Sequence, residues 1–175
     1  NEIIAILLKH LKERGIDGSV VKTVGSSLLI DRVAAKLGIN VIETAVGFKH
    51  VGEAMRKFNP VIGGEESGGL SIQGHIPEKD GILANLLVLE AMAYSNKSLV
   101  ELQKDLDNFV GCKFFNDRID KKLTNFDEVK PVLEKFKNLE SINGLKITKK
   151  DFKDGVKLYL EDNESWILVR PSGTE

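Results

Sequence analysis

The chain has 175 residues, of which 42% are hydrophobic and 29% charged, and its net charge is −1. These values are typical of a globular protein that can bury a substantial core. The balanced charge argues against nucleic acid or a membrane surface as the main partner. The single cysteine, Cys112, excludes an intrachain disulfide and favours a reducing cytoplasm.

Helices and strands are predicted in alternation over the first part of the chain. Apolar residues at helical spacing predict helices over 3–11, 28–37 and 51–58, and β-branched or apolar runs predict strands over 19–24, 39–44 and 61–62. Such alternation with short connections is typical of βαβ units and a parallel sheet. We therefore expect an α/β fold, a three-layer α/β/α domain with a mostly parallel sheet, over residues 1–110.

The third predicted strand runs into the glycine-rich loop Gly63-Gly64-Glu65-Glu66-Ser67-Gly68-Gly69. In open α/β sheets, ligands bind beyond the carboxyl ends of the strands, where this loop is expected to lie. Glycine lets the backbone turn sharply and approach a ligand, and a carboxylate beside a hydroxyl suits the hydroxyl groups of a sugar. The alternative is a hairpin loop with solvated acids. A nucleotide P-loop is excluded, because no Lys-Ser/Thr pair follows Gly68.

Two more helices complete the expected first domain. The segment from Gly81 to Tyr94 is apolar on more than one face, which predicts a helix packed against the sheet and a neighbouring element. The capping-box pattern Ser98-Leu99-Val100-Glu101 predicts the start of another helix that continues to Phe109. We place the domain boundary near Val110-Gly111.

Residues 111–175 predict a second domain of the α+β type. Strands are expected over 112–119, 145–148, 155–160 and 165–170, with a helix over 130–139 and a hairpin turn over 161–164. Arg170-Pro171-Ser172-Gly173-Thr174 follows the last of these strands. An arginine fork, hydroxyl donors and a glycine that frees backbone N–H groups are suited to phosphate. The alternative is an exposed arginine before a proline turn.

Three motifs together resemble the α-D-phosphohexomutases, the phosphoglucomutase and phosphomannomutase family. They are the Gly64–Gly68 loop, His75-Ile76-Pro77-Glu78-Lys79-Asp80-Gly81, and the segment from Arg170 to Thr174, in this order. The family has a Gly-Glu-x-Ser-Gly sugar loop in its third domain and an Arg-Pro-Ser-Gly-Thr phosphate loop in its fourth. The resemblance implies a third domain over 1–110 and an incomplete fourth domain over 111–175, truncated at its C-terminus. Because the chain opens without methionine in a helical pattern, we expect a fragment.

Several residue roles are implied by this resemblance. The sugar would be bound by Gly64, Glu65, Ser67 and Gly68, and the phosphate that is not reacting by Arg170, Ser172, Gly173 and Thr174. Lys79 matches a substrate-contacting lysine of the glucose-type mutases, and it precedes Asp80, the expected N-cap of a helix whose N-terminus favours anions.

Three further positions are open to more than one interpretation. Gly47-Phe48-Lys49 resembles a substrate-facing Thr-Gly-Phe/Trp-Lys segment, although Val46 stands where the family has threonine, and it makes Lys49 a candidate sugar contact. His75 would support its loop or contact the ligand. Glu66 would face solvent or brace the loop.

The implied activity is that of a mutase that moves phosphate between the 1- and 6-positions of a hexose. It would proceed through a hexose 1,6-bisphosphate, with Mg²⁺ in the full-length enzyme. The family's phosphoserine loop and its Asp-x-Asp-x-Asp-Arg magnesium loop belong to earlier domains, and neither motif occurs in this sequence. We therefore expect no catalytic or metal-binding residue in this chain, no turnover by the chain alone, and the hexose phosphate and the earlier domains as its partners.

Other classes of protein remain as alternatives. A non-catalytic module that binds sugar phosphates would keep the same loops. An unrelated nucleotide-binding domain would require a Gly-x-Gly-x-x-Gly after a strand, which is missing. Among the mutases, the glucose-like segments Glu65-Glu66-Ser67 and Glu78-Lys79-Asp80-Gly81 favour phosphoglucomutase over enzymes for mannose or amino sugars.

Overall fold

The structure is a computed structural model that describes residues 1–122, 125–162 and 164–172. It divides the chain into two compact units, residues 1–116 and 117–175. The first unit is built around one four-stranded sheet and the second around another.

The sheet of the first unit is mostly parallel. It contains β1 (Val20–Thr23), β2 (Val41–Thr44), β3 (Ile62–Gly64) and β4 (Leu70–Ile72), in the order β2-β1-β3-β4. β1 runs parallel to both β2 and β3, as expected for βαβ crossovers, whereas β4 runs antiparallel to β3. The β4 strand was not predicted from the sequence, and it turns the segment after β3 into a hairpin at the edge of the sheet.

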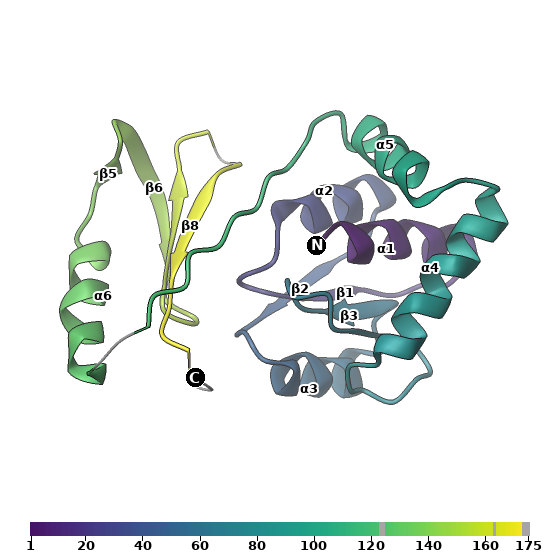
Figure 1. Cartoon of the computed structure of the whole chain (residues 1–175), viewed down its shortest axis with the longest axis horizontal. Coiled ribbons are helices and arrows are strands. Elements are labelled where there is room, and N and C mark those ends of the chain that lie inside the picture. Colours follow the sequence, from purple (N-terminus) through teal and green to yellow (C-terminus); the bar gives the residue numbers. More distant parts are fainter. Residues whose placement is uncertain (123–124, 163, 173–175) are drawn as a thin grey trace. The chain divides into compact units, whose positions relative to one another are not determined.

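Helices cover both faces of this sheet, as Figure 1 shows. They are α1 (Glu2–Glu13), α2 (Leu28–Leu37), α3 (Phe48–Phe58), α4 (Gly81–Ser95) and α5 (Leu99–Val110). Val20 of β1 packs in the core that contains α1 and α2, whereas the next residue, Val21, packs against α3. Because successive side chains of a strand point to opposite faces, β1 supplies both cores. The predicted three-layer α/β/α domain is confirmed.

The helix ends follow their local sequence signals. Ser98 accepts a hydrogen bond from the Glu101 N–H, and the Glu101 carboxylate accepts one from the Ser98 N–H, so the predicted capping box is confirmed. Gly38 ends α2 in the left-handed conformation, with φ of 67°. These caps fix where the loops between helices and strands begin.

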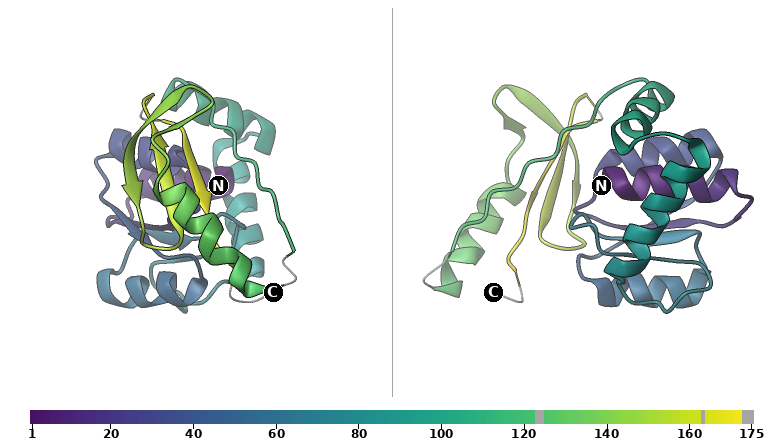
Figure 2. Two further views of the ribbon diagram at one scale, coloured as in Figure 1. Left: turned by 90° about the vertical axis from the view of Figure 1, so that its left-hand side faces the viewer. Right: turned by 45° about the vertical axis from the view of Figure 1, so that its right-hand side comes forward.

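Helix α4 is apolar on more than one face but is covered on one side only. It packs against α1, α5 and β4, and its Leu87 and Ala91 are buried (Figure 2). Its outer face carries Ile82, Leu86 and Leu89, which are exposed. The predicted packing against the sheet and a neighbouring element therefore holds for one face of this helix.

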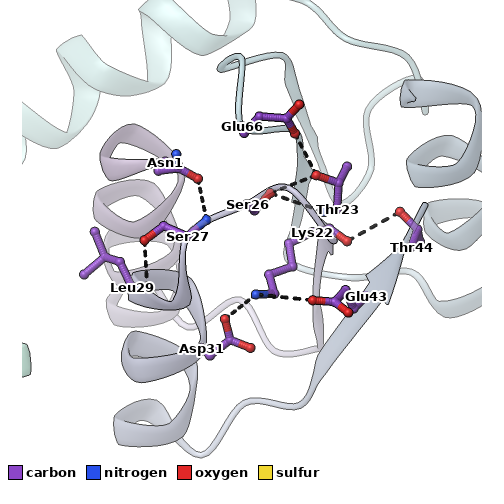
Figure 3. Close-up of polar contacts among 10 residues, drawn as sticks. All are labelled: Asn1, Lys22, Thr23, Ser26, Ser27, Leu29, Asp31, Glu43, Thr44 and Glu66. Atoms are coloured by element: carbon purple, nitrogen blue, oxygen red, sulfur yellow. Dashed lines mark hydrogen bonds and ion pairs between the residues drawn. The ribbon is translucent and has the colours of Figure 1, made fainter. Parts of the chain in front are cut away.

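The carboxyl end of β1 is surrounded by a group of buried polar side chains (Figure 3). Lys22 is 1% exposed, and its ammonium group pairs with Asp31 of α2 and lies 3.7 Å from the Glu43 carboxylate of β2. Thr23 and Ser26 are fully buried beside it. A buried charge requires partners, and the two acids meet that requirement.

The second unit is an antiparallel sheet with one helix. Its elements are the 3₁₀-helix η1 (Phe126–Glu128), α6 (Val129–Lys137), β5 (Ser141–Ile142), β6 (Leu145–Asp151), β7 (Val156–Leu160) and β8 (Trp166–Val169). The strands pair in chain order, and α6 packs on one face through Leu133 and Phe136 (Figure 2). The predicted fold class, an α/β domain followed by an α+β unit, is confirmed.

Two predictions in this unit need comment. The strand predicted over 112–119 is wrong, because no strand forms there and Phe115 and Ile119 are exposed. Phe114, Phe115 and Ile119 suit a strand, but Asn116 and Asp117 between them are residue types depleted in strands. The hairpin between β7 and β8 is confirmed, although residue 163 of its turn lies outside the described residues.

Candidate functional site

The glycine-rich loop joins β3 to β4 at the carboxyl end of β3. Gly64 pairs with Leu70, the Glu65 N–H donates to the Gly69 carbonyl at 2.9 Å, and the Gly68 N–H donates to the Glu65 carbonyl at 3.0 Å. A Cβ on Gly64 would lie 2.6 Å from the Ile4 side chain, so the glycine lets α1 pack closely against the strand. The loop is thus a closed hairpin turn at the sheet edge where ligands bind in open α/β folds.

Glu65 is not the solvated acid of an ordinary hairpin, because its side chain is buried with 6% of the residue exposed. Its carboxylate accepts a hydrogen bond from the Gly47 N–H, at the N-terminus of α3, and lies 4.0 Å from the Lys79 ammonium. Burial is the main influence on this group and raises its pKa above the ordinary 4.5, although Lys79 acts in the opposite direction. The structure thus holds the Glu65 carboxylate between a backbone N–H donor and a cation at the sheet edge.

The raised pKa predicts how Glu65 affects the stability of the first unit. The folded state binds the Glu65 proton more tightly than the unfolded state does, so its stabilising contribution is present at low pH and is lost as pH rises above about 4.5 and through the folded-state pKa. Glu65→Gln removes this titration. We expect the Tm of the variant, relative to the parent chain, to rise as pH increases from 4 to 7 in thermal unfolding of the 175-residue chain. A constant Tm difference across that range would contradict the burial argument.

The other predicted sugar contacts are more exposed. Ser67 is exposed at the tip of the loop, Lys49 is exposed on the first turn of α3, and the Lys79 side chain is 60% exposed. The structure brings Glu65, Lys79 and the Gly47 backbone together. Gly47 has φ of 121°, a conformation that favours glycine and that directs its N–H toward the loop.

Asp80 organises the segment that carries Lys79. Its carboxylate accepts from the N–H groups of Ile82 and Leu83 at 2.9 and 3.0 Å, so it is the N-cap of α4, as predicted. His75 Nε2 lies 3.1 Å from the same carboxylate. The hydrogen bond from the Leu83 N–H is the main reason why the pKa of Asp80 is lowered. His75 therefore supports its loop, which is one of the two roles considered from the sequence.

A contact of Glu66 was not specified by the sequence. The Glu66 carboxylate accepts a hydrogen bond from the Thr23 hydroxyl at 2.7 Å, so Glu66 braces the loop rather than facing solvent alone (Figure 3). Thr23 lies in the β1 segment, 43 positions earlier in the chain. No local pattern indicates this partner.

The predicted phosphate loop follows β8 in the second unit. Arg170 Nε donates to Asp154 Oδ2 at 3.3 Å, and both side chains are partly buried. A Cβ on Gly155 would lie 2.3 Å from the Val169 carbonyl, so the Asp154-Gly155 turn fits closely against the strand end that carries Arg170. Ser172 is exposed, while Gly173 and Thr174 lie outside the described residues. Asp154 was missed from the sequence, where only its position before the glycine that precedes a predicted strand distinguished it.

No three histidine, cysteine, aspartate or glutamate side chains gather into a metal-binding group among the described residues. Among the described helices, none combines the length and apolar character that crossing a membrane requires.

The first unit is a three-layer α/β/α domain, and an antiparallel α+β unit follows it. Residues 1–109 match the family described as "Phosphoglucomutase/phosphomannomutase, alpha/beta/alpha domain III". The chain belongs to the phosphoglucomutase/phosphomannomutase family.

Individual relatives extend the similarity beyond the first unit. The chain is 31% identical over 176 residues to a phosphoglucosamine mutase of Methanocaldococcus jannaschii, covering 100% of this chain and 37% of the relative. It is 34% identical over 165 residues to a phosphoglucomutase/phosphomannomutase of Thermococcus kodakarensis, covering 94% of this chain and 33% of the relative. The crystal structure of a proposed phosphomannomutase from Thermus thermophilus superposes with a TM-score of 0.79 at 34% identity, over 97% of this chain and 34% of that one. The chain thus spans about a third of the length of these relatives.

Proposed function

We propose that this chain is the part of a phosphohexomutase that recognises the hexose and its unreactive phosphate. The full-length enzyme would be a cytoplasmic intramolecular phosphotransferase that interconverts hexose 1-phosphate and 6-phosphate through the 1,6-bisphosphate. The observation that carries this proposal is the Glu65 carboxylate, buried at the sheet edge between the Gly47 N–H and the Lys79 ammonium. Membership of the mutase family supports the class of reaction.

The proposed roles follow from the chemistry of each group. Glu65 would accept hydrogen bonds from two sugar hydroxyls, Ser67 would donate or accept another, and Lys79 and Lys49 would offer charged donors. Arg170 would bind phosphate oxygens through its planar fork, with the Ser172 and Thr174 hydroxyls and the Gly173 backbone. Phosphoryl transfer depends mainly on positioning and electrostatic stabilisation, so such binding groups contribute directly to its rate. The phosphoserine and the Mg²⁺ ligands would be supplied by other domains of the full-length enzyme.

We propose glucose phosphate as the first candidate substrate, because the loop Glu65-Glu66-Ser67 and the segment Glu78-Lys79-Asp80-Gly81 are glucose-like. A glucosamine phosphate is the second candidate, favoured by the similarity to several proteins named phosphoglucosamine mutase. A non-catalytic sugar-phosphate-binding module is the alternative outside the enzymes.

The experiment compares the 175-residue chain with the full-length protein that contains it. Each is incubated with glucose 1-phosphate or glucosamine 1-phosphate, Mg²⁺ and the corresponding 1,6-bisphosphate, and the 6-phosphate is measured. We expect conversion by the full-length protein and none by the 175-residue chain, because the chain offers binding groups without a phosphoryl donor. Sustained conversion by the chain would show that its catalytic residues were missed, and an inactive full-length protein that still binds hexose phosphate would favour the binding module.

A further inference from the structure

We propose that Glu66 is a positioning residue whose carboxylate is held in a socket formed by Thr23, Gly25 and Ser26, and that this contact holds the loop presenting Glu65 and Ser67. The inference rests on the proposed function of that loop. It assigns a role to Glu66 and to the Gly25-Ser26 turn, neither of which contacts the sugar in the proposal above.

The socket is buried and shaped for the carboxylate. Thr23 and Ser26 are both 0% exposed, and the Thr23 hydroxyl donates to Glu66 Oε2 at 2.7 Å. A Cβ on Gly25 would lie 3.2 Å from both Cδ and Oε2 of Glu66, closer than ordinary van der Waals contact. The absence of a Cβ at Gly25 therefore leaves the space that the carboxylate occupies.

The hydrogen bonds of the socket have a single consistent direction. The Thr23 hydroxyl has one proton, and it donates that proton to Glu66. The Ser26 hydroxyl, 3.1 Å from Thr23 Oγ1, must then be the donor to Thr23, while Ser26 Oγ accepts from the Thr23 N–H at 3.3 Å. Hydrogen bonds arranged in such a chain polarise one another, and here the chain ends on the charged acceptor.

The register of the sheet explains why this contact reaches the site. Lys22 of β1 pairs with Gly64 of β3, so the residues that follow, Thr23 and Glu65, lie beside each other at the carboxyl edge. The adjacent carboxylates then go to different partners. Glu65 accepts from Gly47 before α3, whereas Glu66 accepts from Thr23. The two contacts hold the loop to the segment before α3 and to the end of β1. Loss of the Thr23 contact would free the loop from β1.

The test uses Thr23→Val, which removes the hydroxyl, Thr23→Ser, which keeps it, Glu66→Ala, and the double variant Thr23→Val/Glu66→Ala. In the 175-residue chain, hydrogen exchange is measured at the Glu65 and Gly68 amides, whose hydrogen bonds close the loop, and at α3 amides as an internal control. We expect Thr23→Val to accelerate exchange about tenfold at the two loop amides, with little change in α3, and Thr23→Ser to restore it. In the full-length mutase, we expect Thr23→Val and Glu66→Ala each to lower kcat/KM about tenfold, Thr23→Ser to stay close to the parent, and the double variant to lose no more than Thr23→Val or Glu66→Ala alone.

Three results would overturn the proposal. One is equal acceleration at the loop and α3 amides, which would indicate a general loss of stability. The second is unchanged exchange in Thr23→Val. The third is additive loss of kcat/KM in the double variant. If the full-length parent has no mutase activity, the proposed function fails, but the exchange measurements still decide whether Glu66 holds the loop.

Discussion

Glu65→Gln in the full-length mutase is expected to lower kcat/KM by about tenfold to a hundredfold. The glutamine keeps the size of the side chain but removes the charge that strengthens hydrogen bonds from sugar hydroxyls, each worth roughly 1.5–3 kcal/mol. Because Glu65 is buried next to the Gly47 N–H and Lys79, water cannot readily replace it as an acceptor. The measurement is steady-state kinetics with hexose 1-phosphate under saturating bisphosphate.

The matched control is the adjacent Glu66→Gln. Its amide oxygen can still accept from the Thr23 hydroxyl, so the socket contact is retained in weaker form. We expect a loss smaller than that of Glu65→Gln. Equal kinetics for both variants and the parent would refute the assignment of Glu65 as a sugar-binding residue.

Arg170→Ala is expected to raise the KM for hexose phosphate by about a hundredfold or more, because two charge-assisted hydrogen bonds to phosphate would be lost together. Arg170 Nε donates to Asp154 at 3.3 Å, which restricts the guanidinium and does not use its two terminal nitrogens. Arg170→Lys keeps the charge but loses the planar fork, and we expect an intermediate KM. The measurement is the dependence of initial rate on substrate concentration.

Arg118→Ala provides the comparison for Arg170, since it removes an exposed arginine that also pairs with an aspartate, Asp120. We expect the KM of this variant to equal that of the parent. A KM for Arg170→Ala within about threefold of the parent would contradict the phosphate-binding role.

Sequence patterns predicted the layers of the first unit because strand and helix periodicities are local properties. The strands around Val20–Thr23 and Val41–Thr44 each carry β-branched residues. The helix that connects them is bounded by Ser27 and Gly38, two residue types that are recognisable in a sequence as helix caps. The β4 strand was missed because Leu70–Ile72 is too short to show a period. The prediction of a strand over 112–119 was wrong for a different reason. This segment contains phenylalanine and isoleucine, which suit a strand, but no other strand pairs with it.

The candidate site shows the same limit at the level of side chains. The Gly64–Gly68 motif was visible in the sequence, and so was the cap Asp80, because each lies within a few positions of its partners. The burial of Glu65 and the contact from Thr23 to Glu66 depend on which strands become neighbours. Asp154 meets Arg170 only after β7 and β8 have paired. These contacts follow from tertiary structure and have no local signal.

The β3–β4 hairpin has a consequence for the order in which the site assembles. Its register partners, from Ile62 with Ile72 to Gly64 with Leu70, enclose a short segment of chain, whereas Val20 of β1 must meet Ile62 across the whole α2–β2–α3 segment. The entropy lost on closing a loop grows with its length, so pairing β3 with β4 costs less chain entropy than pairing β3 with β1. The carboxyl edge of the sheet at this site therefore depends on the long-range pairing of β3 with β1, whereas the turn that carries Glu65 is closed by the local pairing of β3 with β4.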